Sequence, residues 1–221
     1  MEWGPLLLTL KLAILSTFFL VILGIPLAYW LAYTKTKIKP VAEAVISMPL
    51  ILPPTVLGFY LLLAFGNSGF LGNWLNEVLG IQLAFSFTGL VVASVIYSLP
   101  FMVQPIQSGF SNLPDNLREA SYSLGKSKFT TFSKVLLPNI KTSLLTGMVL
   151  TFAHTIGEFG VVLMIGGNIP GETRVASIAI YDEVEALNYA SANRLSLVLF
   201  VLCFAILLLV YLINNGKRFW R

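Results

Sequence analysis

Long stretches without a charged side chain constrain the fold of this 221-residue sequence more than any other feature. Residues 12–34 contain no Asp, Glu, Lys, Arg or His. As a helix, at about 1.5 Å per residue, such a stretch crosses the roughly 30 Å of hydrocarbon in a bilayer. Charged residues make up 11% of the chain, against about 25% in a soluble domain, and the mean hydropathy is +0.84. Too few polar groups remain to cover a water-facing surface, so lipid is the solvent for most of this chain.

Five apolar stretches predict five transmembrane helices and therefore an all-α polytopic membrane protein. Their approximate ranges are 8–34, 44–65, 85–110, 142–165 and 195–213. We expect the second helix to be kinked against protein neighbours, because its prolines free backbone carbonyls that lipid cannot satisfy: Pro49, Pro53 and Pro54. The first stretch is too long for a signal peptide and is expected to be retained. Residues 1–221 are expected to form a single membrane domain without an attached nucleotide-binding domain.

Basic residues are concentrated on one side of the predicted helices. Eleven of the fourteen follow the first, third and fifth helices: Lys35, Lys37, Lys39, Arg118, Lys126, Lys128, Lys134, Lys141, Lys217, Arg218 and Arg221. The opposite segments carry mainly acidic side chains. Because cytoplasmic loops are enriched in Lys and Arg, we predict an external N-terminus and a cytoplasmic C-terminus. The net charge of +4 then belongs to segments near anionic lipid and indicates no nucleic-acid binding.

The segment 113–138, between the third and fourth predicted helices, is polar and contains several lysines. We expect a short helix over 116–124, capped by Asp115 and ended at Gly125, which permits a turn. A second, amphipathic helix is predicted over 127–137, because four apolar residues recur at spacings of three and four: Phe129, Phe132, Val135 and Leu136. Such a polar pair of helices is suited to docking a soluble partner. The alternative is a solvated loop helix with ordinary lipid-surface contacts.

The pattern Glu119-Ala120-Ser121-x3-Gly125-x9-Val135-Leu136-Leu137-Pro138 resembles the Glu-Ala-Ala-x3-Gly-x9-Ile-x-Leu-Pro motif of permease subunits of bacterial ABC importers. Ser121 and Val135 replace the second alanine and the isoleucine. The resemblance implies the type I ABC importer permease fold, with this segment as a coupling helix that rests in a groove of a cytoplasmic ATPase. By position, the docking residues are Glu119, Ala120 and Gly125. The full set of coupling residues is Glu119, Ala120, Ser121, Gly125, Val135, Leu137 and Pro138.

Two further segments, 154–160 and 166–174, resemble the Gly-Glu-Phe-Gly and Asn-Ile-Pro-Gly-Glu-Thr-Arg segments of molybdate permeases. The stretch 49–58 is similar to the same subfamily. This resemblance implies that the cargo is a tetrahedral oxyanion, with molybdate first. Tungstate and sulfate or thiosulfate remain open, because the permeases for these anions are similar.

His154 and Glu158 are the only ionisable pair within a predicted span, and their spacing of four places them on one helix face. Intramembrane charge is costly, so this face is expected to turn toward protein or a water-filled path. Two interpretations stay open: a mutually satisfied structural pair, or a gate in the substrate path together with Phe159 and Gly160. With one histidine and no Cys/His cluster, the sequence predicts no metal site. It also contains no recognisable nucleophile–base set, so we predict no catalytic residue.

The family resemblance also implies an assembly. We expect a homodimer with the oxyanion passing between its subunits, two ABC ATPase subunits below, and a soluble oxyanion-binding protein above, in a bacterial inner membrane. ATP and Mg²⁺ are expected in the ATPase and no cofactor on this chain. Gly125-Lys126-Ser127 resembles the end of a phosphate-binding loop, but Ala120 stands where that loop requires glycine. The alternative of another class is an ATP-independent secondary carrier, which would require more buried ionisable groups and repeated halves.

Overall fold

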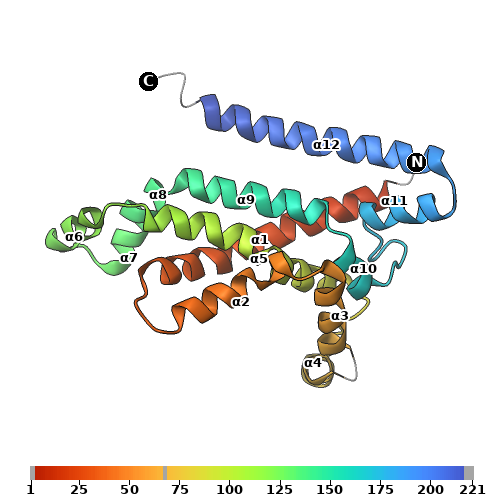
Figure 1. Ribbon diagram of the computed structural model, residues 1–221, viewed down its shortest axis with the longest axis horizontal. Helices are drawn as coiled ribbons and strands as arrows, with labels where there is room; N and C mark the ends of the chain where they lie inside the picture. The colour runs from red at the N-terminus through yellow and green to blue at the C-terminus, as the bar shows by residue number, and fades with distance from the viewer. Residues whose placement is uncertain (1–2, 67–68, 217–221) are drawn as a thin grey trace.

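The computed structural model describes residues 3–66 and 69–216, and every regular element within them is a helix (Figure 1). The all-α prediction is therefore confirmed. The elements are α1 (Gly4–Tyr33), α2 (Lys39–Ile51), α3 (Pro54–Phe65), α4 (Phe70–Leu79), α5 (Phe87–Ser111), α6 (Asp115–Ser123), α7 (Lys128–Thr131), the π-helix η1 (Phe132–Leu136), α8 (Leu137–Asn139), α9 (Lys141–Ile156), α10 (Gly160–Gly166), α11 (Ala176–Glu185) and α12 (Tyr189–Gly216).

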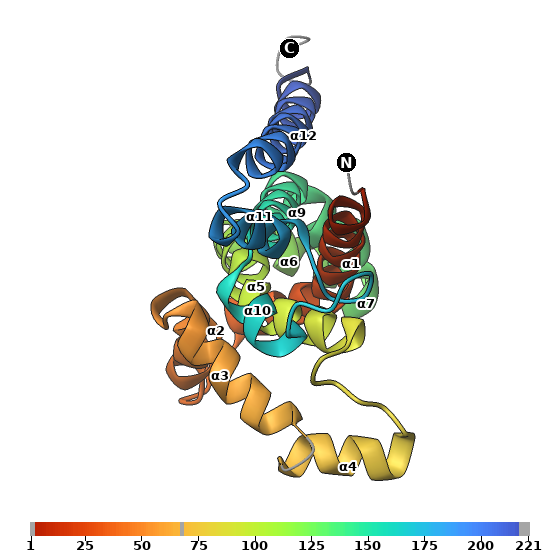
Figure 2. The same ribbon diagram turned by 90° about the vertical axis from the view of Figure 1, so that its right-hand side faces the viewer.

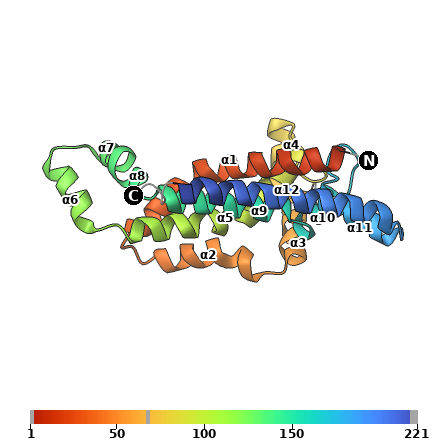
Figure 3. The same ribbon diagram turned by 90° about the horizontal axis from the view of Figure 1, so that it is seen from above.

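Helices α1, α5 and α9 lie side by side and form the central bundle (Figures 1 and 3). Small residues let the helices approach closely, as is usual where lipid removes the hydrophobic drive for helix association. A Cβ added to Gly24 of α1 would lie 2.8 Å from Cγ of Met102 on α5. At Gly109 of α5, a Cβ would lie 2.6 Å from Cβ of Ser143 on α9. Buried apolar side chains fill the space between the helices, among them Leu20, Val103, Ile106 and Phe110.

The second predicted span, 44–65, is not one kinked helix. Helices α2 and α3 are separated at Leu52 and Pro53 and meet at an angle of 113°. Two consecutive prolines, Pro53 and Pro54, explain the break, because each lacks an N–H and each holds the residue before it in an extended conformation. As a result, α3 leaves the bundle and, with α4, forms an arm that points away from it (Figures 1 and 2).

The fourth predicted span, 142–165, is also interrupted. Helix α9 ends at Ile156, and α10 begins at Gly160, so residues 157–159 are not helical. Phe159 has φ −130° and ψ −61°, which is outside the helical region. Helix α10 then packs on α3 so closely that a Cβ at Gly160 would lie 2.8 Å from Cβ of Pro54. The two breaks therefore lie next to each other.

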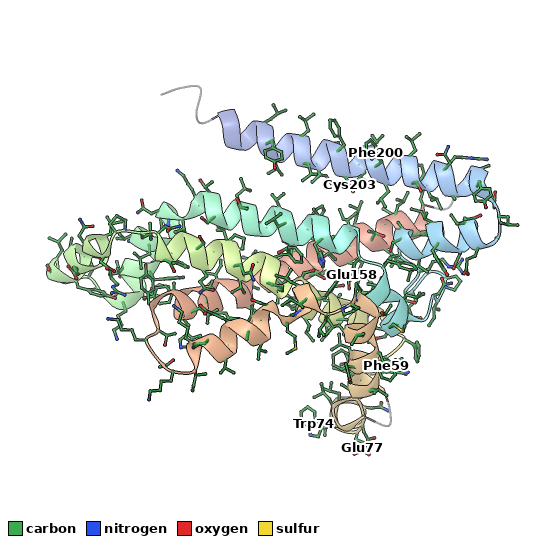
Figure 4. All side chains as sticks on the ribbon, in the orientation of Figure 1. Phe59, Trp74, Glu77, Glu158, Phe200 and Cys203 are labelled. Atoms are coloured by element: carbon green, nitrogen blue, oxygen red, sulfur yellow. The ribbon has the colours of Figure 1, made fainter. Side chains whose placement is uncertain are left out.

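Three helices are long and apolar enough to cross a membrane by length and composition: α1, α5 and residues Tyr189–Leu212 of α12. The number rises to five if each bent pair, α2 with α3 and α7–α8 with α9, counts as one span. Helix α12 packs mainly on α11 and exposes one apolar side along its length, including Phe200 (Figure 4). That side is suited to contact with lipid.

The basic turns on which the predicted orientation is based lie at the same end of the bundle. Helices α6–α8 and the turn between α1 and α2, with Lys35 and Lys37, lie at one end of the bundle, and the N-terminus lies at the other (Figures 1 and 3). Lys217, Arg218 and Arg221 also contributed to that prediction, but they lie outside the described residues.

Candidate coupling segment and membrane cavity

The polar segment folds as two short helical pieces joined by a left-handed turn. Gly125 has φ +70°, and the Lys126 N–H donates to the Ser121 carbonyl at 3.1 Å, which closes the end of α6. A Cβ at Gly125 would meet no atom within 4 Å, so the backbone conformation alone favours glycine there. The predicted cap at Asp115 is wrong: Pro114 occupies the cap position, and Asp115 lies in the first turn without a capping hydrogen bond.

The seven predicted coupling residues fall into two groups. Glu119, Ala120, Gly125 and Pro138 are exposed. Ser121 is only 6% exposed, and its hydroxyl is hydrogen-bonded to Thr131 at 2.9 Å, which joins α6 to α7. The two remaining residues, Val135 and Leu137, pack against the bundle core. The first group is therefore available to a partner, and the second maintains the shape of the segment.

The tip of the segment presents apolar side chains to solvent. Leu124 and Phe129 are each 76% exposed. The predicted apolar face is therefore wrong at Phe129, whereas Phe132 and Leu136 do pack on the bundle. The reason is that α7 buries Thr131, which is bonded to Ser121, and Phe129, two positions earlier in the helix, then lies on the opposite side.

An aromatic cluster connects the segment to the bundle. The Tyr29 ring of α1 lies 5.0 Å from that of Phe132 in η1 and 5.4 Å from that of Phe110 in α5, measured between centroids. The Arg118 guanidinium of α6 lies 4.6 Å from the Tyr33 ring centroid. Interlocked rings of this kind pack with little freedom. These contacts join α6 and η1 to α1 and α5.

The adjacent helix breaks border a cavity of about 450 Å³. Its lining comes from α3, α5, α9, α10 and the linker before α10: Pro54, Thr55, Tyr97, Ala153, His154, Gly157, Glu158, Phe159 and Gly160. The structure thus brings all four predicted path residues, His154, Glu158, Phe159 and Gly160, to one cavity. Thr55 and Tyr97 are lining residues that the sequence did not indicate.

His154 and Glu158 do not form the predicted pair on one helix. Glu158 lies after the end of α9, and the two side chains have different partners. His154 Nδ1 is 2.9 Å from Ser98 Oγ, and its ring stacks on Phe101 at a centroid distance of 4.1 Å. Each ionisable group is therefore held separately, by hydroxyl groups of α5.

Glu158, labelled in Figure 4, joins the linker between α9 and α10 to α5 and α11. Its side chain is 4% exposed, and Oε2 accepts a hydrogen bond from Ser94 of α5 at 2.7 Å. The main-chain carbonyl of Glu158 accepts another from Ser177 of α11 at 2.6 Å. Next to it, the Phe159 ring packs on Tyr181 of α11, with centroids 5.0 Å apart. These contacts fix the non-helical linker between α9 and α10.

The loop before α11 is held by polar side chains. Asn168 donates to the Asp182 carboxylate at 2.8 Å and accepts from Arg174 Nε at 2.8 Å. Arg174 also forms an ion pair with Asp182, at 3.5 Å. In α11, the Tyr181 hydroxyl donates to the Glu185 carboxylate, and this hydrogen bond raises the pKa of Tyr181.

Among the described residues, no three His, Cys, Asp or Glu side chains are grouped as in a metal site.

Comparison with known proteins identifies the family. Residues 24–218 match the family described as "Binding-protein-dependent transport system inner membrane component". The chain belongs to this family. Among its members, the molybdenum transport system permease protein ModB of Azotobacter vinelandii is 47% identical over 213 residues, which cover 96% of this chain and 92% of that protein. The probable sulfate transport system permease protein cysT of Prototheca wickerhamii is 32% identical over 212 residues, covering 96% and 82%.

The same fold occurs in a solved structure of the MetNI methionine ABC transporter in inward-facing conformations. The TM-score is 0.74 at 19% sequence identity, over 96% of this chain and 94% of that one. The predicted type I importer permease fold is thereby confirmed. As a member of this inner membrane component family with several apolar helices, the protein is an integral membrane protein.

Proposed function

We propose that this permease is the membrane-spanning subunit of an ATP-driven importer of a tetrahedral oxyanion, with molybdate as the cargo. The observation with the greatest weight is the 47% identity to a molybdenum permease over nearly the whole of both chains. Sulfate is the second candidate, because the sulfate permease relative also covers 96% of the chain. Tungstate has the same tetrahedral shape and charge as molybdate and is the third.

The proposed partners fit surfaces that the fold leaves exposed. Two ABC ATPase subunits dock on the exposed residues of the coupling segment, Glu119, Ala120 and Gly125, beside the apolar tip formed by Leu124 and Phe129. A soluble oxyanion-binding protein docks on the opposite, outer end. ATP and Mg²⁺ bind to the ATPase subunits, so this chain performs translocation only. The assembly lies in the inner membrane of a bacterium.

A second copy of the chain completes the translocation path. Helix α3 is apolar on all its sides and leaves the bundle, and its outward side chains include Phe59, Tyr60 and Leu63. A helix with no polar face is stable only when protein or lipid surrounds it. We assign this arm to the homodimer interface, where the cavity at the helix breaks opens toward the two-fold axis. Closure of the ATPases moves α6, and the aromatic cluster passes the movement to α1 and α5.

Reconstitution tests this function. The permease, its ATPase and its binding protein are placed in proteoliposomes, and uptake and ATP hydrolysis are measured together. Molybdate is expected to stimulate both, tungstate to compete, and sulfate to compete weakly. Uptake of sulfate that molybdate and tungstate do not reduce would replace the proposed cargo with sulfate. Uptake without any ATP would contradict the importer mechanism itself.

A further inference from the structure

His154 is the single histidine of the chain, and its ring orientation is fixed from three sides. Ser98 lies 2.9 Å from Nδ1, Phe101 stacks on one face at 4.1 Å, and the Tyr97 ring centroid lies 4.6 Å away. All three contacts come from α5. The ring therefore cannot turn without breaking both a hydrogen bond and aromatic packing.

The hydrogen bonds behind the ring assign its proton. Thr155 Oγ1 donates to the Thr151 carbonyl at 3.0 Å, which uses its only proton. Ser98 Oγ lies 3.2 Å from Thr155 Oγ1, so in this contact Ser98 is the donor. Having used its proton, Ser98 can only accept from His154. All three contacts are satisfied together only when Nδ1 of His154 is protonated and donates.

The other ring nitrogen is left for the cavity. Nε2 forms no hydrogen bond with any residue in 3–66 or 69–216, and the ring lines the 450 Å³ cavity beside the hydroxyl groups of Thr55 and Tyr97. Glu158 also lines this cavity: its Oε2 accepts from Ser94, its Oε1 has no hydrogen-bond partner among the described residues, and in its ionised form the group would repel an anion. No Asp or Glu side chain in the described residues forms an ion pair with His154.

We infer that Nε2 of His154 contacts the tetrahedral oxyanion through one shared proton as the anion crosses this cavity. With Nδ1 protonated, Nε2 of the neutral ring has a lone pair, and an unprotonated oxyanion offers only acceptors. The contact therefore takes one proton, which arrives on the oxyanion in its singly protonated form, so that no hydroxide is left in the cavity. Ser98 and Thr155 are positioning residues for this contact. The inference rests on the proposed function and names the residue at which the cargo is bound in transit.

Two variants separate substrate contact from a structural role. In His154→Asn the amide takes the position of Nδ1 and keeps the bond to Ser98; in His154→Gln the amide reaches the position of Nε2. A hydrogen bond to a charged group is worth a factor of about ten or more. We expect His154→Asn to lower oxyanion uptake per assembled complex about tenfold or more, and His154→Gln to retain most of it. Equal losses, equal retention or the reverse order would overturn the inference.

A spectroscopic test needs no variant. Because the chain has one histidine, ¹⁵N-histidine labelling of this subunit alone gives one pair of ring signals. Without oxyanion, we expect a protonated Nδ1 and an unprotonated Nε2. Saturating molybdate should shift the Nε2 signal toward the protonated value in wild type, while Nδ1 stays protonated. An Nε2 signal that does not respond to molybdate, or a resting ring protonated on Nε2, would contradict the assignment.

The outcomes distinguish this inference from the function on which it rests. Wild-type complex is assayed with molybdate, tungstate and sulfate before any variant. If the wild-type complex takes up none of the three anions, the proposed function is wrong. Normal wild-type uptake with a ring that ignores the transported anion would remove only the role of His154.

Discussion

Single polar residues in the interior determine how the broken helices are held. Within residues 3–66 and 69–216, Glu158 has no charged partner; Ser94 and Ser177 bind its side chain and its carbonyl. One residue thereby fastens the linker to both α5 and α11. Because an unpaired polar group in an apolar interior is costly, these hydrogen bonds matter more for the fold than their number suggests.

Glu158→Gln and Glu158→Ala are predicted to differ. The glutamine carbonyl can still accept from Ser94, so the melting temperature and uptake should stay close to wild type. Alanine leaves the Ser94 hydroxyl unpaired and should reduce the free energy of unfolding by about 1–3 kcal/mol. Thermal unfolding of the purified complex measures the difference. Loss of uptake in Glu158→Gln at an unchanged melting temperature would show instead that Glu158 acts directly in the path.

Gly125 is predicted to tolerate asparagine better than alanine. Its φ of +70° lies in the left-handed region, where asparagine is accepted more readily than other residues. Alanine should weaken the turn by about 1 kcal/mol, since space is not limiting there. We expect less uptake per ATP hydrolysed in Gly125→Ala, with Gly125→Asn in between. Ser123→Ala, an exposed change in the same segment, is the control; if it has the same effect, the turn is not the cause.

At the level of elements, the coupling segment has an inner side for the bundle and an outer side for a partner. The inner side includes Ser121, Phe132 and Leu136, and the outer side includes Leu124 and Phe129. Exposed apolar side chains on a polar segment mark a protein contact more often than a free surface. The burial of Thr131 produces this division, because Phe129, two positions earlier, lies on the opposite side of α7.

Phe129→Asp is predicted to weaken binding of the ATPase without unfolding the permease. The ring is 76% exposed, so its loss removes little internal packing, while a contact residue of this size contributes about 1–2 kcal/mol or more. We expect at least a tenfold weaker association in a pull-down titration, at an unchanged melting temperature. The matched control is Phe200→Ala, compared with Phe129→Ala, because Phe200 is 69% exposed on the apolar side of α12, where an aspartate would meet lipid. If Phe200→Ala weakens the association as much as Phe129→Ala, Phe129 is not at the contact.

At the level of the whole molecule, the arm formed by α3 and α4 breaks the compact outline of the bundle (Figures 2 and 4). Phe59 on α3 and Trp74 on α4 are among its exposed aromatic side chains. Helix α3 packs closely on α10, because a Cβ at Gly58 would lie 2.9 Å from Cβ of Met164. An arm with exposed aromatic side chains outside its own bundle fits a role in contact with a second subunit.

Cysteine crosslinking tests this arrangement. Cys203 is the only cysteine, so Cys203→Ala provides a background without thiols. In that background, Tyr60→Cys, at a position 62% exposed on α3, should form crosslinked dimers in membranes. Phe200→Cys on α12 should not. The opposite result would place the dimer interface on α12 and return α3 to lipid.

Much of the fold could be predicted from local pattern. The apolar range 85–110 corresponds to α5, and Gly125 does end α6 in a turn. The sequence predicted only a kink near residues 52–53 and an uninterrupted helix across 157–159, although it contains Pro53, Pro54 and Gly157 at these places. The spacing of apolar residues indicates which segments form apolar helices. It does not indicate the direction in which the chain continues after a helix ends. Helix α4 and helix α11 are too short for an apolar-run criterion and were not predicted.

The sequence by itself determined that lipid surrounds most of the chain, that the fold is helical and that a coupling motif is present. These properties depend on residue type and on spacing along the chain. Only the tertiary structure decided which motif residues face a partner and which face the bundle, since that depends on how α6, α7 and η1 pack on one another and on the bundle. It also separated His154 from Glu158. Their partners Ser98, Ser94 and Ser177 come from distant parts of the chain, and hydrogen bonds between such residues exist only after the helices have packed.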